Sequence, residues 1–138
     1  MGNQTVKFRH EVIDADPPGS HHAVTLVAGR LAWCAPPDWE PHILRDDLFH
    51  PHSLGIADFN GDGLPDIFVG EMGLGKNPDP RMILYLNRAA AEFDEVIFER
   101  GIPTHEAKVA DLTGDGRPDI VGKPYVPERH IDVWFNEA

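Results

Sequence analysis

The sequence predicts an all-β protein made of repeated sheets, and two observations carry this prediction. A nine-residue segment rich in Asp and Gly occurs twice, at residues 58–66 and 111–119, and the copies are 53 residues apart (111 − 58 = 53). Each copy runs directly into a short apolar segment, 67–70 or 120–122, which is typical of a buried strand. No long helical pattern is evident, and 13 Gly with 13 Pro supply turns in quantity.

Both Asp-rich segments have the composition of a calcium-binding loop. Oxygen-bearing side chains occupy positions 1, 3, 5 and 9 of each segment, and Ca²⁺ prefers about six to eight oxygen ligands. Glycines at positions 4 and 6 permit the sharp backbone that lets these side chains converge. With the backbone carbonyl at position 7, the expected ligands are Asp58, Asn60, Asp62, Leu64 and Asp66 in one loop, and Asp111, Thr113, Asp115, Arg117 and Asp119 in the other. The sequence therefore predicts two Ca²⁺ ions per chain.

An EF-hand is the first competing interpretation, because its loop also begins with alternating Asp and Asn followed by Gly. An EF-hand requires a Glu at position 12 of the loop and a helix on each side. Position 12 is Val69 in the first segment and Gly122 in the second, and both segments lead into predicted strands. The EF-hand interpretation is therefore rejected.

The loops and their surroundings resemble the FG-GAP or VCBS repeat of β-propellers, including integrin α chains. The resemblance is specific at 56–70 and 109–122, where Ala-Asp precedes each loop and an Ile/Val strand follows it. The spacing of the copies is within the range of propeller-blade periods. The resemblance implies that each loop joins the first and second strands of a blade and binds Ca²⁺ in a structural role. It also implies an extracellular or periplasmic location, although no signal peptide is recognised in this chain.

Other segments recur in the same order and predict a single propeller segment, residues 1–138, with three four-stranded blades. The blades cover about 15–45, 50–99 and 103–138. Third strands are predicted at 31–35, 83–87 and 132–136, and outer strands at 8–13, 39–44 and 93–98. The first blade has a strand at 26–29 but lacks the Asp-rich loop, so it is not expected to bind calcium at the equivalent place.

The order of these strands predicts self-assembly. The chain opens with an outer strand, 8–13, that has no blade before it, and its last blade has no outer strand behind it. A propeller needs roughly four to eight blades, so three cannot close a ring. Two copies would form a six-bladed homodimer, closed when each N-terminal strand completes the last blade of the neighbouring copy. The alternative is that the chain is a fragment of a longer propeller.

Histidines recur before the loops and are candidates for a second site. His52 and His105 each lie six residues before the first loop Asp, and His22 has a similar place in the first blade. Because the innermost strands of a propeller start near its channel, these side chains would face the axis and suit Zn²⁺ or proton transfer. Glu71, at the end of a second strand, would join that face. The alternative is that each His serves the fold by bonding to the loop before it.

The charge and composition of the chain exclude some classes of binding partner. The formal net charge of −11, from 23 acidic and 12 basic residues, argues against nucleic acids and anionic membranes as partners. No apolar run is long enough for membrane insertion. The sequence favours a non-catalytic, calcium-binding module that binds a glycan or a protein through its loops. The alternative is a polysaccharide lyase or sugar dehydratase that uses His52 and His105 with Glu71, but of the Tyr, Arg and His set expected there only the histidines are evident.

Overall fold

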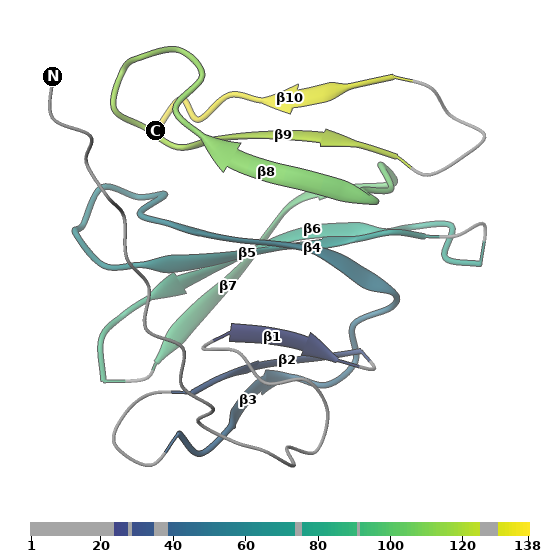
Figure 1. The fold of residues 1–138 in the computed structure, drawn as a ribbon, viewed down its shortest axis with the longest axis vertical. Coiled ribbons are helices and arrows are strands. Elements are labelled where there is room, and N and C mark those ends of the chain that lie inside the picture. Colours follow the sequence, from purple (N-terminus) through teal and green to yellow (C-terminus); the bar gives the residue numbers. More distant parts are fainter. Residues whose placement is uncertain (1–23, 28, 35–38, 74–75, 91, 125–129) are drawn as a thin grey trace, which may run out of the picture.

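The computed structural model describes residues 24–27, 29–34, 39–73, 76–90, 92–124 and 130–138, and for 24–27 only the backbone. All regular structure within these ranges is β-strand, arranged in three antiparallel sheets (Figure 1). The all-β prediction is therefore confirmed, whereas a closed propeller remains a prediction. The predicted outer strand 8–13 and His22 lie outside the described residues. No helix that could cross a membrane occurs in the described ranges.

Each sheet is a meander in which strands adjacent in sequence pair with one another. The first sheet contains β1 (Val24–Val27), β2 (Arg30–Trp33) and β3 (His42–Arg45). The second contains β4 (Pro51–Ala57), β5 (Asp66–Glu71), β6 (Arg81–Asn87) and β7 (Phe93–Arg100). The third contains β8 (Glu106–Ala110), β9 (Asp119–Lys123) and β10 (Asp132–Trp134).

The sequence repeat is also a structural repeat. The unit β4, loop, β5, β6 recurs as β8, loop, β9, β10, and the registers agree between the two units. Ala57 pairs with Asp66 as Ala110 pairs with Asp119, and β5 meets β6 in the register in which β9 meets β10. The second sheet has the four strands expected of a complete unit, and the first and third each have three within the described residues.

One predicted element begins later than the sequence indicated. The outer strand expected from Trp39 starts only at His42. Trp39 has a φ of 58°, in the left-handed region, which interrupts an extended strand. The alternation of apolar and polar residues did not reveal this turn.

The second sheet is the centre of the molecule because both of its faces are covered. Its central strand β5 is buried along its whole length. One apolar cluster joins it to the first sheet and a second joins it to the third; the buried members are Leu31, Leu48, Ile67, Val69, Ile83 and Tyr85 in the first cluster, and Phe59, Phe68, Met82, Ala107 and Ile120 in the second. Strands that are buried on both faces have continuous apolar sequences, and the Ile-Phe-Val sequence of β5 is an example.

The innermost strands β4 and β8 of neighbouring sheets approach closely. A Cβ placed on Gly55 would lie 2.4 Å from Cγ2 of Val109. Only glycine allows that separation, so the close packing of the two sheets depends on the missing side chain. Both Asp-rich loops follow these strands and so emerge at the same end of the molecule (Figure 1).

Candidate functional site

The first Asp-rich loop is organised by Asp58, which follows the last residue of β4. Its Oδ1 accepts hydrogen bonds from the backbone N–H groups of Gly61 (2.7 Å) and Asp62 (3.1 Å), and its Oδ2 accepts one from Gly63 (2.8 Å). Gly61 and Gly63 have φ angles of 75° and 85°, which side chains rarely tolerate. These two turns wrap the backbone around one carboxylate.

The second loop repeats this arrangement contact for contact. Asp111 accepts hydrogen bonds from the backbone N–H groups of Gly114 (2.7 Å), Asp115 (3.2 Å) and Gly116 (2.8 Å). The φ angles of its two glycines are 76° and 88°. The sequence repeat is therefore conserved in structure down to individual hydrogen bonds.

The acid at position 9 of each loop is buried and joins the loop to its sheet. Asp66 accepts hydrogen bonds from the backbone N–H groups of Phe59 (2.8 Å) and Asn87 (2.8 Å). In the second loop, Asp119 accepts the corresponding bonds from Leu112 and Asn136, both 2.9 Å. Each carboxylate thus ties the second residue of its loop to an Asn, which is the last residue of β6 in one repeat and lies just beyond β10 in the other.

The sequence motif identifies position 9 only as a metal ligand, so sequence reasoning missed its role as a hydrogen-bond acceptor that joins the loop to the sheet. The available signal was the Asn that ends the predicted third strand in both repeats, Asn87 and Asn136. The Nδ2 of Asn136 also donates to the carbonyl of Phe59 (2.9 Å), which connects the first loop with the third sheet.

Positions 3 and 5 are exposed and already partnered within the loops. Asn60 Nδ2 donates to Asp62 Oδ2 (2.9 Å), and the Leu64 N–H donates to Asp62 Oδ1 (2.9 Å). In the second loop, Arg117 donates to Asp115 from its backbone N–H and from its guanidinium (2.6 Å). These two contacts are the main causes that lower the pKa of Asp115.

The donor chemistry of both loops suits a hard cation. Carboxylate, amide, hydroxyl and carbonyl oxygens are the ligands that Ca²⁺ prefers, and a carboxylate oxygen that accepts one N–H retains a further lone pair. Among the described residues, however, no three His, Cys, Asp or Glu side chains are gathered closely enough to hold a metal. The loops therefore supply suitable atoms, but the Arg117 guanidinium competes with a cation for Asp115.

Residues 58–122 match the family model of the FG-GAP-like repeat. This segment is similar to an FG-GAP-like repeat. The match runs from the first Asp of the first loop to β9, after the second loop, and confirms the resemblance inferred from the sequence. No curated protein and no solved structure matches the chain significantly.

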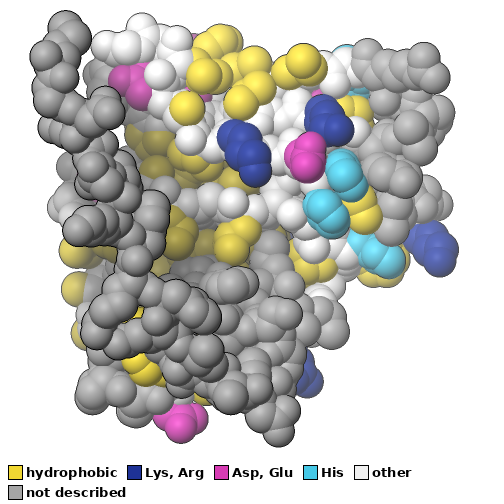
Figure 2. All heavy atoms as spheres, viewed as in Figure 1, with side chains coloured by type: hydrophobic (Ala, Val, Ile, Leu, Met, Phe, Trp, Pro, Cys, Tyr) yellow, Lys and Arg dark blue, Asp and Glu magenta, His cyan; other side chains and the backbone are white. Residues whose placement is uncertain are grey.

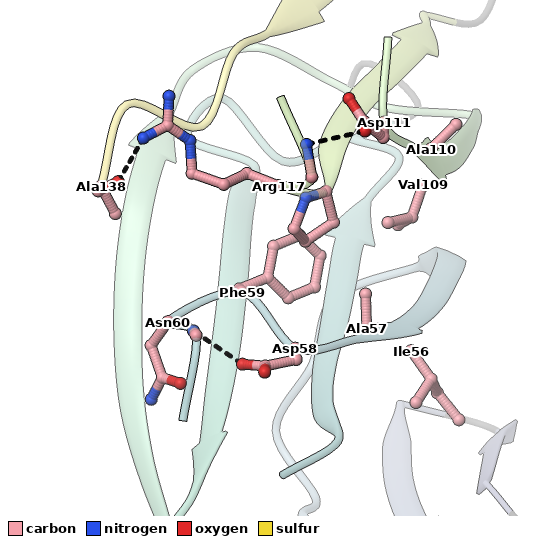
Figure 3. A pocket seen from close by; sticks show the side chains of 13 residues that line it. Ile56, Ala57, Asp58, Phe59, Asn60, Val109, Ala110, Asp111, Arg117 and Ala138 are labelled. Carbon is pink, nitrogen blue, oxygen red and sulfur yellow. Dashed lines mark hydrogen bonds between the residues drawn. The ribbon is translucent and has the colours of Figure 1, made fainter. Parts of the chain in front are cut away.

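A cleft of about 460 Å³ separates the two loops of the FG-GAP-like repeat (Figure 3). Asp58 and Asp111 stand on opposite sides of it, each turned toward the backbone of its own loop. Its apolar lining comes from Ile56, Phe59, Val109 and Pro118. Arg117 also lines the cleft, and its guanidinium donates to the carbonyl of Ala138 (2.6 Å).

Two of the predicted axial histidines lie together, at the junction of β4 and β8. The rings of His52 and His105 are stacked, with centroids 4.3 Å apart and planes 20° apart. Nδ1 of His52 is hydrogen-bonded to the backbone carbonyl of His105. Because ring nitrogens bind metals in the plane of the ring, two nearly parallel rings do not point their nitrogens at one ion. The bond from His52 to the segment before β8 instead resembles the architectural alternative.

Glu71, the proposed partner of these histidines, belongs to a separate buried ion pair. Its carboxylate accepts from the Arg81 guanidinium (2.6 Å) and from the backbone N–H groups of Phe49 (2.7 Å) and Arg81 (2.9 Å). Burial opposes the charged form, but these hydrogen bonds outweigh it and lower the pKa of Glu71. The Glu71 backbone carbonyl also accepts from Thr104 N–H (2.9 Å). Glu71 thus holds the connections into both the second and the third sheet.

The environment of His105 leads us to expect that the folded chain loses stability in mild acid. Burial, with the nearby His52 as a second cause, lowers the pKa of His105 from its usual value of 6.5. The unfolded chain therefore binds more protons than the folded chain as pH falls through about 6.5, and the free energy of unfolding falls with it. We expect the urea midpoint to decrease between pH 7.5 and 5.5, and to decrease less in His105→Gln. Equal slopes in the two proteins would contradict this assignment, since the carboxylates titrate at lower pH.

Proposed function

We propose that this chain is a calcium-stabilised, non-catalytic binding module built on FG-GAP-like repeats. The observation that carries the proposal is the pair of loops at one end of neighbouring sheets, with the same acids, glycines and hydrogen bonds in both. The family match supports a repeat-containing interaction module, and such repeats are typically extracellular.

Calcium would be held by the side chains at positions 1, 3, 5 and 9 of each loop and by the carbonyls of Leu64 and Arg117. Each loop places three acids within nine residues, which is costly because like charges repel at short range. A bound Ca²⁺ supplies the positive charge that offsets this repulsion. Modules in calcium-rich surroundings bind with dissociation constants of about 10⁻⁴ to 10⁻³ M, which agrees with loops whose oxygens are shared with backbone N–H groups.

A glycan or protein ligand would be bound through the loop end of the molecule. The cleft between the loops combines acidic and apolar residues with the Arg117 guanidinium, so it offers both hydrogen-bonding groups and apolar contact. The geometry does not favour the lyase or dehydratase alternative. Glu71 is committed to Arg81, and the stacked rings of His52 and His105 do not converge on a common substrate atom.

Calcium binding is tested by thermal unfolding. We expect Ca²⁺ to raise the melting temperature more than Mg²⁺ does, because ligand binding to the folded state stabilises it by about 2.7 kcal/mol at a hundredfold excess over Kd. Isothermal titration should give two ions for the intact chain and one for either Asp62→Ala or Asp115→Ala.

The control for these variants is Asp94→Ala, which removes an exposed acid outside the loops. It should retain two ions. If Ca²⁺ and Mg²⁺ shift the melting temperature equally, or if the double variant of Asp62 and Asp115 still binds two ions, the calcium assignment is wrong.

A further inference from the structure

We propose that the outer face of the third sheet is a self-association surface that receives the first sheet of a second copy of this chain. The outer face is the side of β8, β9 and β10 turned away from the second sheet. It carries the exposed apolar residues Leu112, Ile131 and Val133. Hydrophobic side chains gather over this end of the molecule (Figure 2).

The argument rests on the structural repeat. Tyr85 and Trp134 pair with Ile67 and Ile120, the equivalent residues of β5 and β9, so positions along β6 can be matched to positions along β10. In this register Leu84 corresponds to Val133, Leu86 to Phe135 and Met82 to Ile131. Phe59 corresponds to Leu112, as the second residue of each loop.

On the second sheet these positions form the surface that the third sheet covers. Phe59 and Met82 belong to the apolar cluster shared with Ile120 and Ala107 of the third sheet, and Leu84 packs against it. Phe59 is 7% exposed, whereas its counterpart Leu112 is 47% exposed. The outer face of the third sheet therefore presents the residue positions of an existing sheet interface, and no sheet formed by the described residues packs against them.

The occupant follows from the direction of stacking. At each contact between successive sheets, the earlier sheet contributes one face and the later sheet contributes the other. The outer face of the third sheet is of the kind that an earlier sheet contributes, so it should receive the kind of face that a later sheet contributes. In a second copy, that face is the side of the first sheet turned away from the second sheet. Leu31 packs toward the second sheet, and Ile43, which pairs with Ala32 rather than Leu31, lies on the other side. Ile43 is 55% exposed and so available for contact, although Ala32, which pairs with it, is buried in the single chain.

One difference between the repeats defines the contact further. Lys108 stands where the second sheet has Gly55, since these residues lie three positions before the first Asp of their loops. A side chain here prevents the close approach that Gly55 gives to Val109. Contact should therefore centre on Leu112 and β10. This inference goes beyond the proposed function, because it requires no ion in either loop.

The test is the mass of the intact chain in solution, measured by sedimentation velocity across a wide concentration range at fixed Ca²⁺ and physiological ionic strength. We expect a species of twice the chain mass. Val133→Asp should weaken self-association by more than about tenfold, because association would bury an unpaired carboxylate. Ile131→Asp should weaken self-association in the same way. Because Ile131 lies outside β10, this substitution should preserve the fold of the chain.

Val96→Asp is the matched control. Val96 and Val133 are both 39% exposed and both lie on outermost strands of their sheets, but Val96 is on β7 of the second sheet. It should leave self-association unchanged. A monomer at every concentration of the intact chain, or equal effects of Val96→Asp and Val133→Asp, would refute the proposal. Unchanged melting of Ile131→Asp shows that its lost association is not unfolding.

Discussion

Arg81→Ala is expected to lower the free energy of unfolding by about 3–5 kcal/mol, because it leaves the carboxylate of Glu71 buried without its partner. Glu71 is fully buried, and Arg81 donates to it from both its guanidinium and its backbone. The backbone N–H remains in the variant, but it cannot offset the loss of the cation. Urea unfolding followed by fluorescence measures the change.

Two controls separate the ion pair from a general loss of packing. Arg88→Ala removes the exposed pair with Asp94 and should cost no more than about 1 kcal/mol. The cost of Arg81→Ala should be smaller at pH 5 than at pH 8, because burial without a cation favours the protonated form of Glu71. A cost that does not depend on pH would show that lost packing of the Arg81 side chain dominates.

Asp66→Ala is expected to destabilise the chain by about 2–5 kcal/mol even in the presence of EDTA. The variant leaves the N–H groups of Phe59 and Asn87 without their acceptor, and each unsatisfied buried group costs about 1–3 kcal/mol. Asp66→Asn should cost less, since an amide oxygen still accepts one of the two bonds. Thermal or urea unfolding in calcium-free buffer gives these values.

Asp62→Ala provides the contrast, because Asp62 is exposed and lies in the same loop. In EDTA it should change the free energy of unfolding by only about 0.5 kcal/mol, as surface substitutions usually do. If both substitutions are harmless in EDTA and both abolish calcium binding, then Asp66 is only a ligand and its bonds to the backbone contribute nothing to stability.

The repeated loops and the strands beside them were predictable from sequence, because their signals are local. Glycines at fixed positions produce the turns of the loops, and the apolar runs after them become β5 and β9. The spacing of the two copies then predicted successive sheets. The family match over 58–122 agrees with this part of the prediction.

The buried ion pair and the stacking of the histidine rings depend on contacts between distant residues, and the sequence pattern did not reveal them. Glu71 looked like an active-site acid because it ends a strand near the predicted channel, whereas Arg81, ten residues later, holds it. Trp39 looked like a strand residue because its neighbours alternate, whereas its backbone is left-handed. In each case the amino-acid composition of the local segment does not indicate the interaction or dihedral angle that decides the structure.

The bond from Asn136 to Phe59 makes the two loops parts of one network. Asp66 accepts a hydrogen bond from the N–H of Phe59, and the side-chain amide of Asn136 donates to the carbonyl of Phe59. The backbone N–H of Asn136 in turn donates to Asp119. Asp119 also accepts from Leu112 in the second loop, which completes an unbroken series of hydrogen bonds from one loop to the other. A ligand that moves Phe59 therefore acts on a chain of contacts that ends in the neighbouring loop. Any free energy of coupling carried by this chain must be reciprocal, so each loop would alter the affinity of the other by the same factor.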